Sequence, residues 1–144
     1  MPDFNAEADP FFNRLNAVIE AHIGDEAFGV AELAQEMNMS RSTLLRRVKS
    51  GTGLSAALYI RKLRLKRAKE MLQGSALTVS EIAYKVGFSS SSYFTKCFRE
   101  EYGYTPSEEG KQAEEHKDER SPKAEDLSPN QFAKKWLWVG AAAV

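Results

Sequence analysis

The side chains best suited to chemistry in this sequence are short hydroxyls and cations that recur in the same order in two places. Ser42 and Arg46 are followed, fifty positions later, by a serine and another cation, Ser92 and Lys96. Hydroxyl, guanidinium and ammonium groups donate hydrogen bonds, and the last two also carry positive charge. The pattern indicates binding of an anionic ligand that offers hydrogen-bond acceptors, rather than the breaking of covalent bonds.

Residues of the kinds that enzymes use for catalysis form no cluster in this sequence. The two histidines, His22 and His116, lie in the first predicted helix and in a charged carboxy-terminal segment. No Cys/His metal spacing, Gly-rich phosphate loop or nucleophile motif is present. We therefore expect no catalytic residue, no metal and no cofactor. The single cysteine, Cys97, and the lack of a secretory signal at residues 1–10 favour a cytoplasmic location.

The positive charge of the chain is concentrated in its middle, although the formal net charge is zero. Residues 1–29 hold one Arg and six acidic residues, a net charge of −5. Residues 30–106 hold thirteen Lys and Arg and six acids, a net charge of +7, and residues 107–144 have a net charge of −2. A basic centre between acidic flanks is typical of a polyanion-binding domain. A solvated basic helix is the alternative.

The spacing of the apolar residues predicts an all-α fold of about seven helices, because no convincing strand pattern is present. A first helix follows Asp9 and Pro10, after a tail of residues 1–9. The longest periodic segment, residues 55–73, predicts a linker helix whose cations, among them Arg61 and Arg64, supply much of the positive charge. It joins two helix-turn-helix units, which are expected at about residues 30–50 and 79–102.

An internal repeat supports the two units. The segment VAELAQEMN (residues 30–38) aligns with VSEIAYKVG (residues 79–87) at an offset of forty-nine, and beyond the turn the offset becomes fifty. Asn38 and Gly87 then fall at the turn, where positive φ lets two helices cross steeply. Ser40 and Ser90 each precede a second helix and are expected to cap it.

The second helix of each unit has an inward and an outward face. At 100° per residue, Phe94 and Phe98 point inward, as do their counterparts Leu44 and Val48. Small polar residues and a cation on the outward face suit readout of the DNA major groove, and an exposed Leu45 suits a thymine methyl. The outward residues are Ser42, Leu45, Arg46 and Lys49 in the first unit and Ser92, Thr95, Lys96 and Arg99 in the second.

These features give the chain a resemblance to the DNA-binding domain of the AraC/XylS family of bacterial transcription regulators. The resemblance covers residues 10–108 and is most specific in RLKRAKEMLQGSALTVSEIAYKVGFSSSSYFTKCFREEYGYTP, residues 64–106. It implies a homeodomain-like fold and a sequence-specific regulator of double-stranded DNA that reads successive major grooves on one face of the duplex, about 34 Å apart. By this resemblance Ser42, Leu45, Arg46, Ser91, Ser92, Thr95 and Lys96 face bases, and Ser40, Lys49, Ser90 and Arg99 face phosphates.

The sequence departs from the family pattern at two places. Ser50 and Gly51 stand where better helix formers are usual, so the first recognition helix is expected to end early. After the capping-box pattern TPSE, residues 105–108, the family usually has an aromatic residue and Arg, whereas this chain has Glu109 and Gly110. The last helix is therefore expected to be short or poorly docked.

The carboxy-terminal segment changes character twice. Residues 109–133 are highly charged and predict a disordered linker. Residues 134–144 begin with two lysines and continue with an uncharged, mostly apolar run. This order is typical of the start of a transmembrane helix on the cytoplasmic side, and a full span needs about 20 residues. We expect a helix that continues beyond Val144 at the inner membrane; a stop codon directly after Val144 would exclude it. A short helix packed on the domain and a partner-binding segment are the alternatives.

A second function remains open at the level of sequence, because fold alone does not determine function. The helix-turn-helix units could serve as a protein-interaction module that docks on RNA polymerase or on a membrane partner. Binding to DNA is distinguished from this alternative by its steep dependence on salt.

Overall fold

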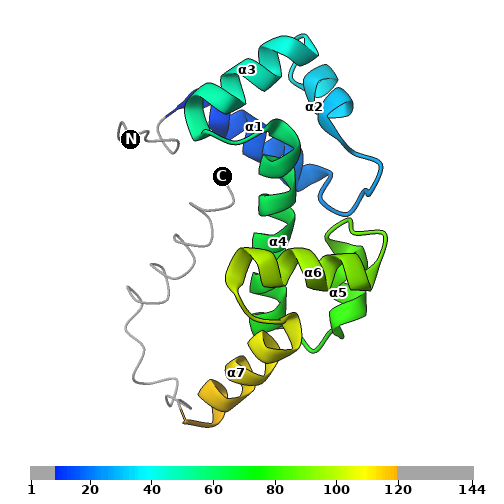
Figure 1. Ribbon diagram of the computed structural model, residues 1–144, viewed down its shortest axis with the longest axis vertical. Coiled ribbons are helices and arrows are strands. Elements are labelled where there is room, and N and C mark those ends of the chain that lie inside the picture. The colour runs from blue at the N-terminus through cyan, green and yellow to red at the C-terminus, as the bar shows by residue number, and fades with distance from the viewer. Residues whose placement is uncertain (1–8, 120–144) are drawn as a thin grey trace.

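Seven α-helices make up the part of the chain that the computed structural model describes, namely the backbone of residues 9–119 and the side chains of residues 9–112 (Figure 1). No strand occurs in these residues, so the prediction of an all-α fold is confirmed. The helices are α1 (Pro10–Ala21), α2 (Val30–Glu36), α3 (Arg41–Thr52), α4 (Ala56–Gly74), α5 (Val79–Lys85), α6 (Ser91–Tyr102) and α7 (Pro106–Glu119).

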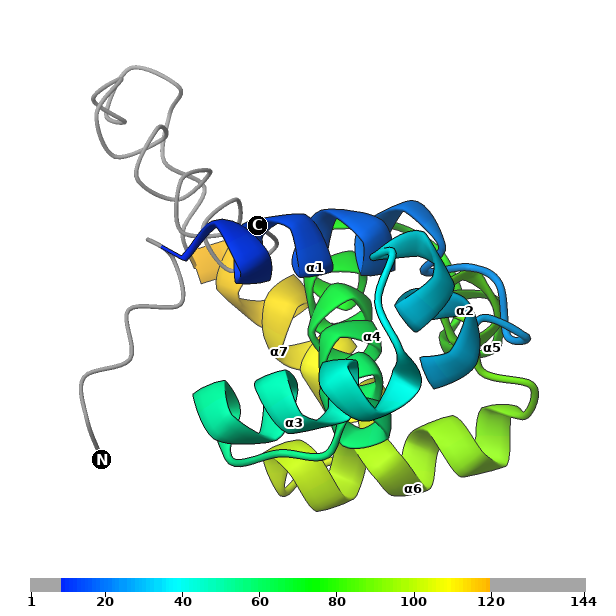
Figure 2. The ribbon, with the colours of Figure 1, turned by 90° about the horizontal axis from the view of Figure 1, so that it is seen from above.

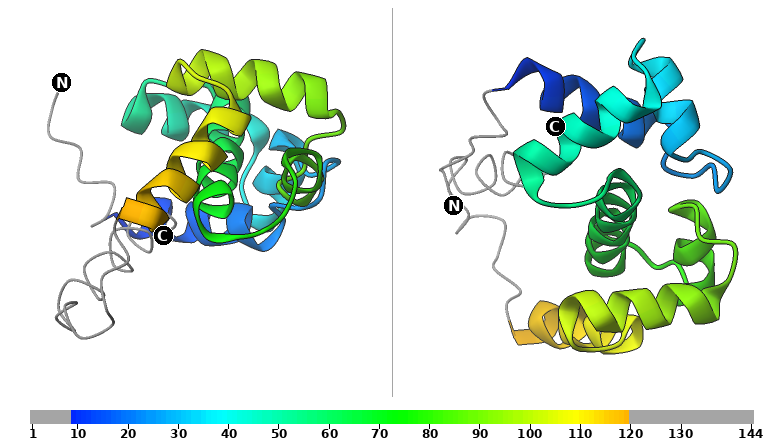
Figure 3. Two further views of the ribbon diagram at one scale, coloured as in Figure 1. Left: turned by 90° about the horizontal axis from the view of Figure 1, so that it is seen from below. Right: turned by 45° about the horizontal axis from the view of Figure 1, so that its top comes forward.

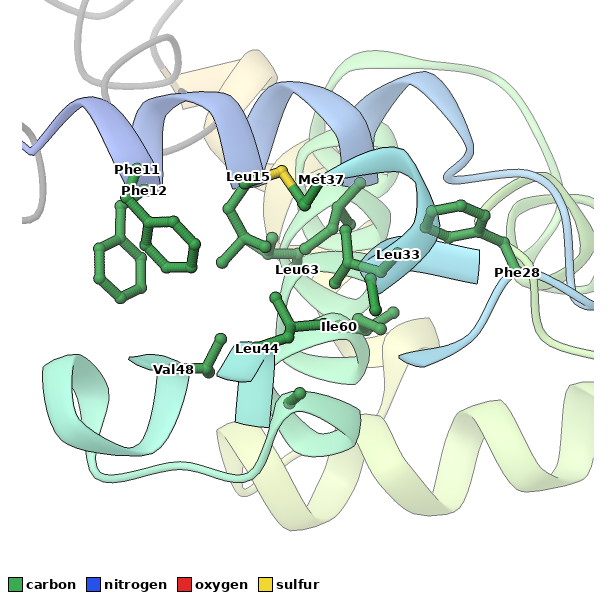
Figure 4. Close-up of a cluster of buried hydrophobic side chains, with 13 residues drawn as sticks. Phe11, Phe12, Leu15, Phe28, Leu33, Met37, Leu44, Val48, Ile60 and Leu63 are labelled. Atoms are coloured by element: carbon green, nitrogen blue, oxygen red, sulfur yellow. The ribbon is translucent and has the colours of Figure 1, made fainter. Parts of the chain in front are cut away.

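Helix α4 is the spine of the molecule and is shared by two subdomains. Its first half packs with α1, α2 and α3 around an apolar cluster that includes Phe12, Leu15, Leu44 and Val48 (Figure 4). Its second half packs with α5 and α6 around a separate cluster in which Phe94 is buried. Each helix-turn-helix unit therefore has its own core, and α4 connects the two.

Side-chain caps explain where the helices of both units begin. The hydroxyl oxygens of Ser40 and Ser90 accept hydrogen bonds from the backbone N–H groups of Thr43 and Tyr93, each at 3.2 Å. These bonds satisfy donors that the first turn of a helix leaves without partners. The turns before the caps contain Asn38 at φ 55° and Gly87 at φ 87°. The predicted caps and positive-φ turns are thus confirmed in both units.

The prediction that the first recognition helix ends early was wrong. Helix α3 continues through Ser50 and Gly51 to Thr52, and Gly53 ends it in the left-handed conformation at φ 76°. A glycine inside a helix costs only about 1 kcal/mol, which tertiary packing can offset. Here the buried Val48 holds this part of α3 on the first apolar cluster.

The prediction of a short or poorly docked last helix was also wrong, as was that of disorder from residue 109 as far as residue 119. Helix α7 packs against α4 and α6. Its Glu109 is only 5% exposed and accepts a hydrogen bond from Gln73 of α4. Burial of the Tyr104 side chain raises its pKa most, and its hydrogen bond with Glu109 raises the pKa further. Glu109 thus docks α7 by polar contacts, at a position where the family usually has an aromatic residue.

Some predictions concern residues that the structure does not describe. The tail at residues 1–8, the remainder of the charged linker at 120–133 and the apolar segment at 134–144 lie outside the described residues. Within residues 9–119, none of the helices combines the length and the apolar character that crossing a membrane requires.

Arg64 lies on α4 at the boundary between the two apolar clusters, since Leu63 belongs to the first and Leu65 to the second. From the sequence, Arg64 was counted among the cations that supply the positive charge of this helix, and the structure shows that its side chain is only 7% exposed. Burial lowers the pKa of Arg64, and the nearby carboxylate of Asp25 opposes this shift. The ordinary pKa of a guanidinium is far above neutrality, so Arg64 remains charged.

Four backbone carbonyls surround the Arg64 guanidinium. Nη2 donates to the carbonyl oxygens of Asp25 and Phe28, each at 3.0 Å. Nη1 donates to the carbonyl oxygen of Val86 at 2.9 Å and to that of Ile23. Three of these carbonyls lie in the loop between α1 and α2, and the fourth lies at the end of α5. The two segments approach on the same side of α4 (Figure 3, right). A single cation therefore joins the two subdomains.

Gly87 is required by this arrangement as well as by its positive φ. A Cβ atom at Gly87 would overlap Nη1 of Arg64 and would lie 2.6 Å from the carbonyl oxygen of Ile23. Gly103, at φ 84°, has no atom within 4 Å of such a Cβ. In the first unit the equivalent position is Asn38, which adopts positive φ with a side chain present. The turn of the second unit is therefore closed to any side chain.

We predict that Gly87→Asn destabilises the protein much more than Gly103→Asn does. Asn tolerates positive φ, so Gly103→Asn should lower the free energy of unfolding by about 1 kcal/mol or less. Gly87→Asn also displaces Arg64 from its carbonyls, and disrupting such a buried charged network costs about 3 to 5 kcal/mol. Urea unfolding monitored by circular dichroism measures both values. Equal losses in the two variants would contradict the role given to Arg64.

Candidate nucleic-acid interface

The second helices of the two units, α3 and α6, lie on the same side of the molecule. In the view from above, both lie on the side of α4 opposite α1 (Figure 2), and the view from below agrees (Figure 3, left). Along the length of the molecule they are separated, with α3 near one end and α6 nearer the middle (Figure 1). The fold thus presents two equivalent helices to one side at different heights.

On α3 the side chains predicted to face outward are more exposed than those predicted to face inward. Ser42, Arg46 and Lys49 are exposed, whereas Leu44 and Val48 are fully buried. Leu45, which was expected to be exposed, is half-buried because it packs against the first apolar cluster. Only part of its side chain remains available to a ligand.

On α6 the outward residues line a shallow concavity. Ser92, Lys96 and Arg99 are exposed and Thr95 is half-buried, whereas Phe94 is fully buried beneath them. The lining is completed by Glu100 and Thr105. The structure therefore brings together the small hydroxyls and cations that the repeat predicted, with one acidic side chain, Glu100, at the rim.

The cations of the two outward faces have few partners within the domain. Within the described residues, Arg46, Lys96 and Arg99 have no hydrogen-bond or ion-pair partner, and Lys49 donates to the carbonyl oxygen of Gly53 at 2.9 Å. Elsewhere, Lys62 is paired with Glu101 at 3.2 Å, Arg67 is paired with Glu70 at 3.4 Å, and Arg47 and Lys69 lie over the rings of Phe11 and Tyr102. The outward faces keep positive charge free for a ligand.

The serines at the start of the two helices are partly committed to the fold. Besides accepting from the backbone of Thr43, the Ser40 hydroxyl donates to Thr43 Oγ1 at 2.8 Å. Ser90 makes the capping bond alone among the described residues, so its hydroxyl proton remains available. Ser91 is half-buried and accepts a hydrogen bond from the Ser80 hydroxyl at 3.3 Å. Ser90 is thus freer than Ser40 to contact a ligand.

Arg41 is a candidate site residue that the sequence reasoning missed. It is exposed at the first position of α3 and has no polar partner within the described residues. The signal was present in the repeat, because the offset of fifty aligns Arg41 with Ser91, which was selected. Applying the register at every position would have found it.

The sequence matches the family model described as "Helix-turn-helix domain" over residues 33–112, more than half of the chain. Among curated proteins, it is 37% identical over 91 residues to histidine kinase P4 of Formosa agariphila and 39% identical over 94 residues to the HTH-type transcriptional activator RhaS of Escherichia coli. These matches cover 63% and 65% of this chain, but only 7% and 34% of the two relatives. The chain is therefore similar to one part of each.

Solved structures share the fold over more of the chain. An AraC-type DNA-binding transcriptional regulator from Chromobacterium violaceum superposes with a TM-score of 0.70 at 30% identity, covering 82% of this chain and 99% of that one. The DNA-binding domain of AdpA, a global transcriptional factor solved in complex with a target DNA, superposes with a TM-score of 0.65 at 28% identity. That match covers 80% of this chain and 99% of the AdpA domain.

Proposed function

The chain belongs to the AraC/XylS family of helix-turn-helix domains, and on this basis we propose that it binds double-stranded DNA sequence-specifically and regulates transcription. The observation that carries the proposal is the pair of equivalent outward faces on α3 and α6. Both carry unpartnered cations among small polar side chains, and both lie on one side of the molecule. DNA offers phosphates to the cations and base edges to the hydroxyls and guanidinium groups.

In this proposal the centre of each face contacts bases and its edges contact phosphates. Ser42, Leu45 and Arg46 of α3 face the bases of one major groove, and Ser91, Ser92, Thr95 and Lys96 of α6 face those of the next. Ser40, Lys49, Ser90 and Arg99 contact phosphates, together with Arg41. The two grooves are about 34 Å apart on one face of the duplex.

The two half-sites should differ in character. Arg46 can donate two parallel hydrogen bonds to guanine, and the exposed part of Leu45 can contact a thymine methyl. The equivalent residues of α6 are Lys96, which donates from a single ammonium, and Thr95. We therefore expect α3 to discriminate more strongly between bases than α6 does.

The wider setting of the domain belongs to the same proposal. A DNA regulator acts where the chromosome is, so we place the domain in the cytoplasm, with RNA polymerase as a further partner. Attachment to the cytoplasmic face of the inner membrane through residues 134–144 is supported by the sequence of that segment alone.

Selection of bound duplexes from a random pool tests the proposal. A two-part motif whose halves are centred about one helical turn apart is the expected result. The selected duplex should bind at least about 10³-fold more tightly than bulk DNA at physiological salt. Recovery of unenriched sequences would favour the protein-interaction module instead.

Substitutions on the two faces should act on different halves of that motif. We predict that Arg46→Ala and Lys96→Ala each weaken binding by about 1 to 3 kcal/mol and relax base preference in one half only. Arg67→Ala removes the same charge, but Arg67 is paired with Glu70 and acts electrostatically on Glu20 of α1, on the opposite side of α4. It should leave base preference intact. Titration of fluorescent duplexes with single-base changes measures these effects, and unchanged preferences in both face variants would show that the wrong faces were chosen.

A further inference from the structure

A second arginine of α4, Arg61, lies about one helical turn before Arg64 but uses few of its donors. Its Nη1 atom donates to the hydroxyl of Tyr93 at 3.3 Å, which is its single hydrogen bond among the described residues. A guanidinium has five N–H donors. Arg64 donates hydrogen bonds to four carbonyls, whereas most N–H donors of Arg61 have no partner among the described residues.

Tyr93, the partner of Arg61, is unusually exposed for an aromatic residue of this domain. It lies on α6 beside the outward face, and 46% of its surface is accessible. Its ring packs against that of Phe88 in a tilted arrangement, with centroids 5.9 Å apart. The ring is therefore held in place while its hydroxyl stays at the surface. After accepting from Arg61, this hydroxyl still has a proton to donate.

The Arg61–Tyr93 pair lies at the boundary between the two subdomains. Both residues line a cleft of about 460 Å³ whose other walls come from the α1–α2 loop, including Phe28, and from the turn at Gly87. Arg61 reaches this position from α4, the helix that connects the two units. A DNA strand that leaves the groove at α3 and enters the groove at α6 must pass between these helices.

We propose that Arg61, oriented by Tyr93, binds a backbone phosphate of the DNA strand that passes between the two recognition helices. This inference rests on the proposed DNA binding and adds a contact from the linker helix to those of α3 and α6. Its unused N–H donors suit the two non-bridging oxygens of a phosphodiester, and the Tyr93 hydroxyl can donate to one of the same two oxygens. The contact carries no base information, so it positions the duplex rather than selecting its sequence.

The charge environment of Arg61 is compatible with this role. The hydrogen bond with Tyr93 raises the pKa of Arg61 most, and the negative charge of Glu100 adds to that effect. Glu100 forms no ion pair with Arg61 within the described residues. Lys62, the residue after Arg61, is instead paired with Glu101 at 3.2 Å. Adjacent cations of α4 thus differ in availability, which provides a matched control.

The salt dependence of binding by the 144-residue chain tests the contact. For Arg61→Gln, the slope of log K against log salt concentration should decrease in magnitude by about 0.9, the value for one lost phosphate contact. Between 50 and 200 mM salt this corresponds to a loss of affinity about 3.5-fold smaller than that of the unaltered protein. The ratio of specific to non-specific binding should not change. Lys62→Gln should leave the slope unchanged.

Neutral methylphosphonate linkages locate the contact. Placed between the two half-sites, they should weaken binding of the unaltered protein but not that of Arg61→Gln; placed within a half-site, they should weaken both. An unchanged slope in Arg61→Gln, or equal sensitivity of both proteins to the central linkages, would overturn the inference while leaving DNA binding intact. Failure of the unaltered protein to bind any duplex would overturn the proposed function, and this inference with it.

Discussion

The buried guanidinium of Arg64 is the interaction on which the arrangement of the two units depends. Each unit has its own apolar core, and hydrophobic burial joins the two units only through α4, which contributes residues to both cores. Arg64 adds directional bonds to carbonyls of the α1–α2 loop and to Val86 after α5. Removing a charge from water is costly unless hydrogen bonds compensate it, so only this close approach of both segments makes the burial tolerable. The same approach excludes any side chain at Gly87.

Helix α4 therefore combines three tasks within a few residues. Leu63 completes the first core, Leu65 completes the second, and Arg64 between them connects the subdomains. One turn earlier, Arg61 is half-buried and keeps part of its side chain accessible. The spine that fixes the two recognition helices in space thus also carries the cation that we propose to contact the DNA between them. On α4, Lys62 and Arg67 are paired with carboxylates, whereas Arg46, Lys96 and Arg99 on the recognition helices have no such partner among the described residues.

Much of the fold was predictable because its determinants are local in sequence. Ser40 and Ser90 are strong caps, Asn38 and Gly87 suit positive φ, and the fifty-residue register identified equivalent positions on both recognition helices. The misses involve contacts between distant residues. An arginine in a basic helix gives no periodic signal of burial, so the sequence did not reveal that Arg64 is buried. Glu109 was taken for a linker residue because its partners, Gln73 and Tyr104, lie on other elements.

If the two units are rigidly connected, they can bind only half-sites at one fixed spacing. A series of duplexes with different spacer lengths tests this most directly. Base pairs would be inserted between the two halves of the selected motif and affinity measured for each duplex. The account predicts that five inserted base pairs, about half a turn, reduce binding to that of a duplex with one half randomised. Ten inserted base pairs, about one turn, return both half-sites to the same face of the duplex but leave them too far apart, so affinity should not recover. Full affinity at either spacing would contradict the account, because it would mean that the two units orient independently despite Arg64.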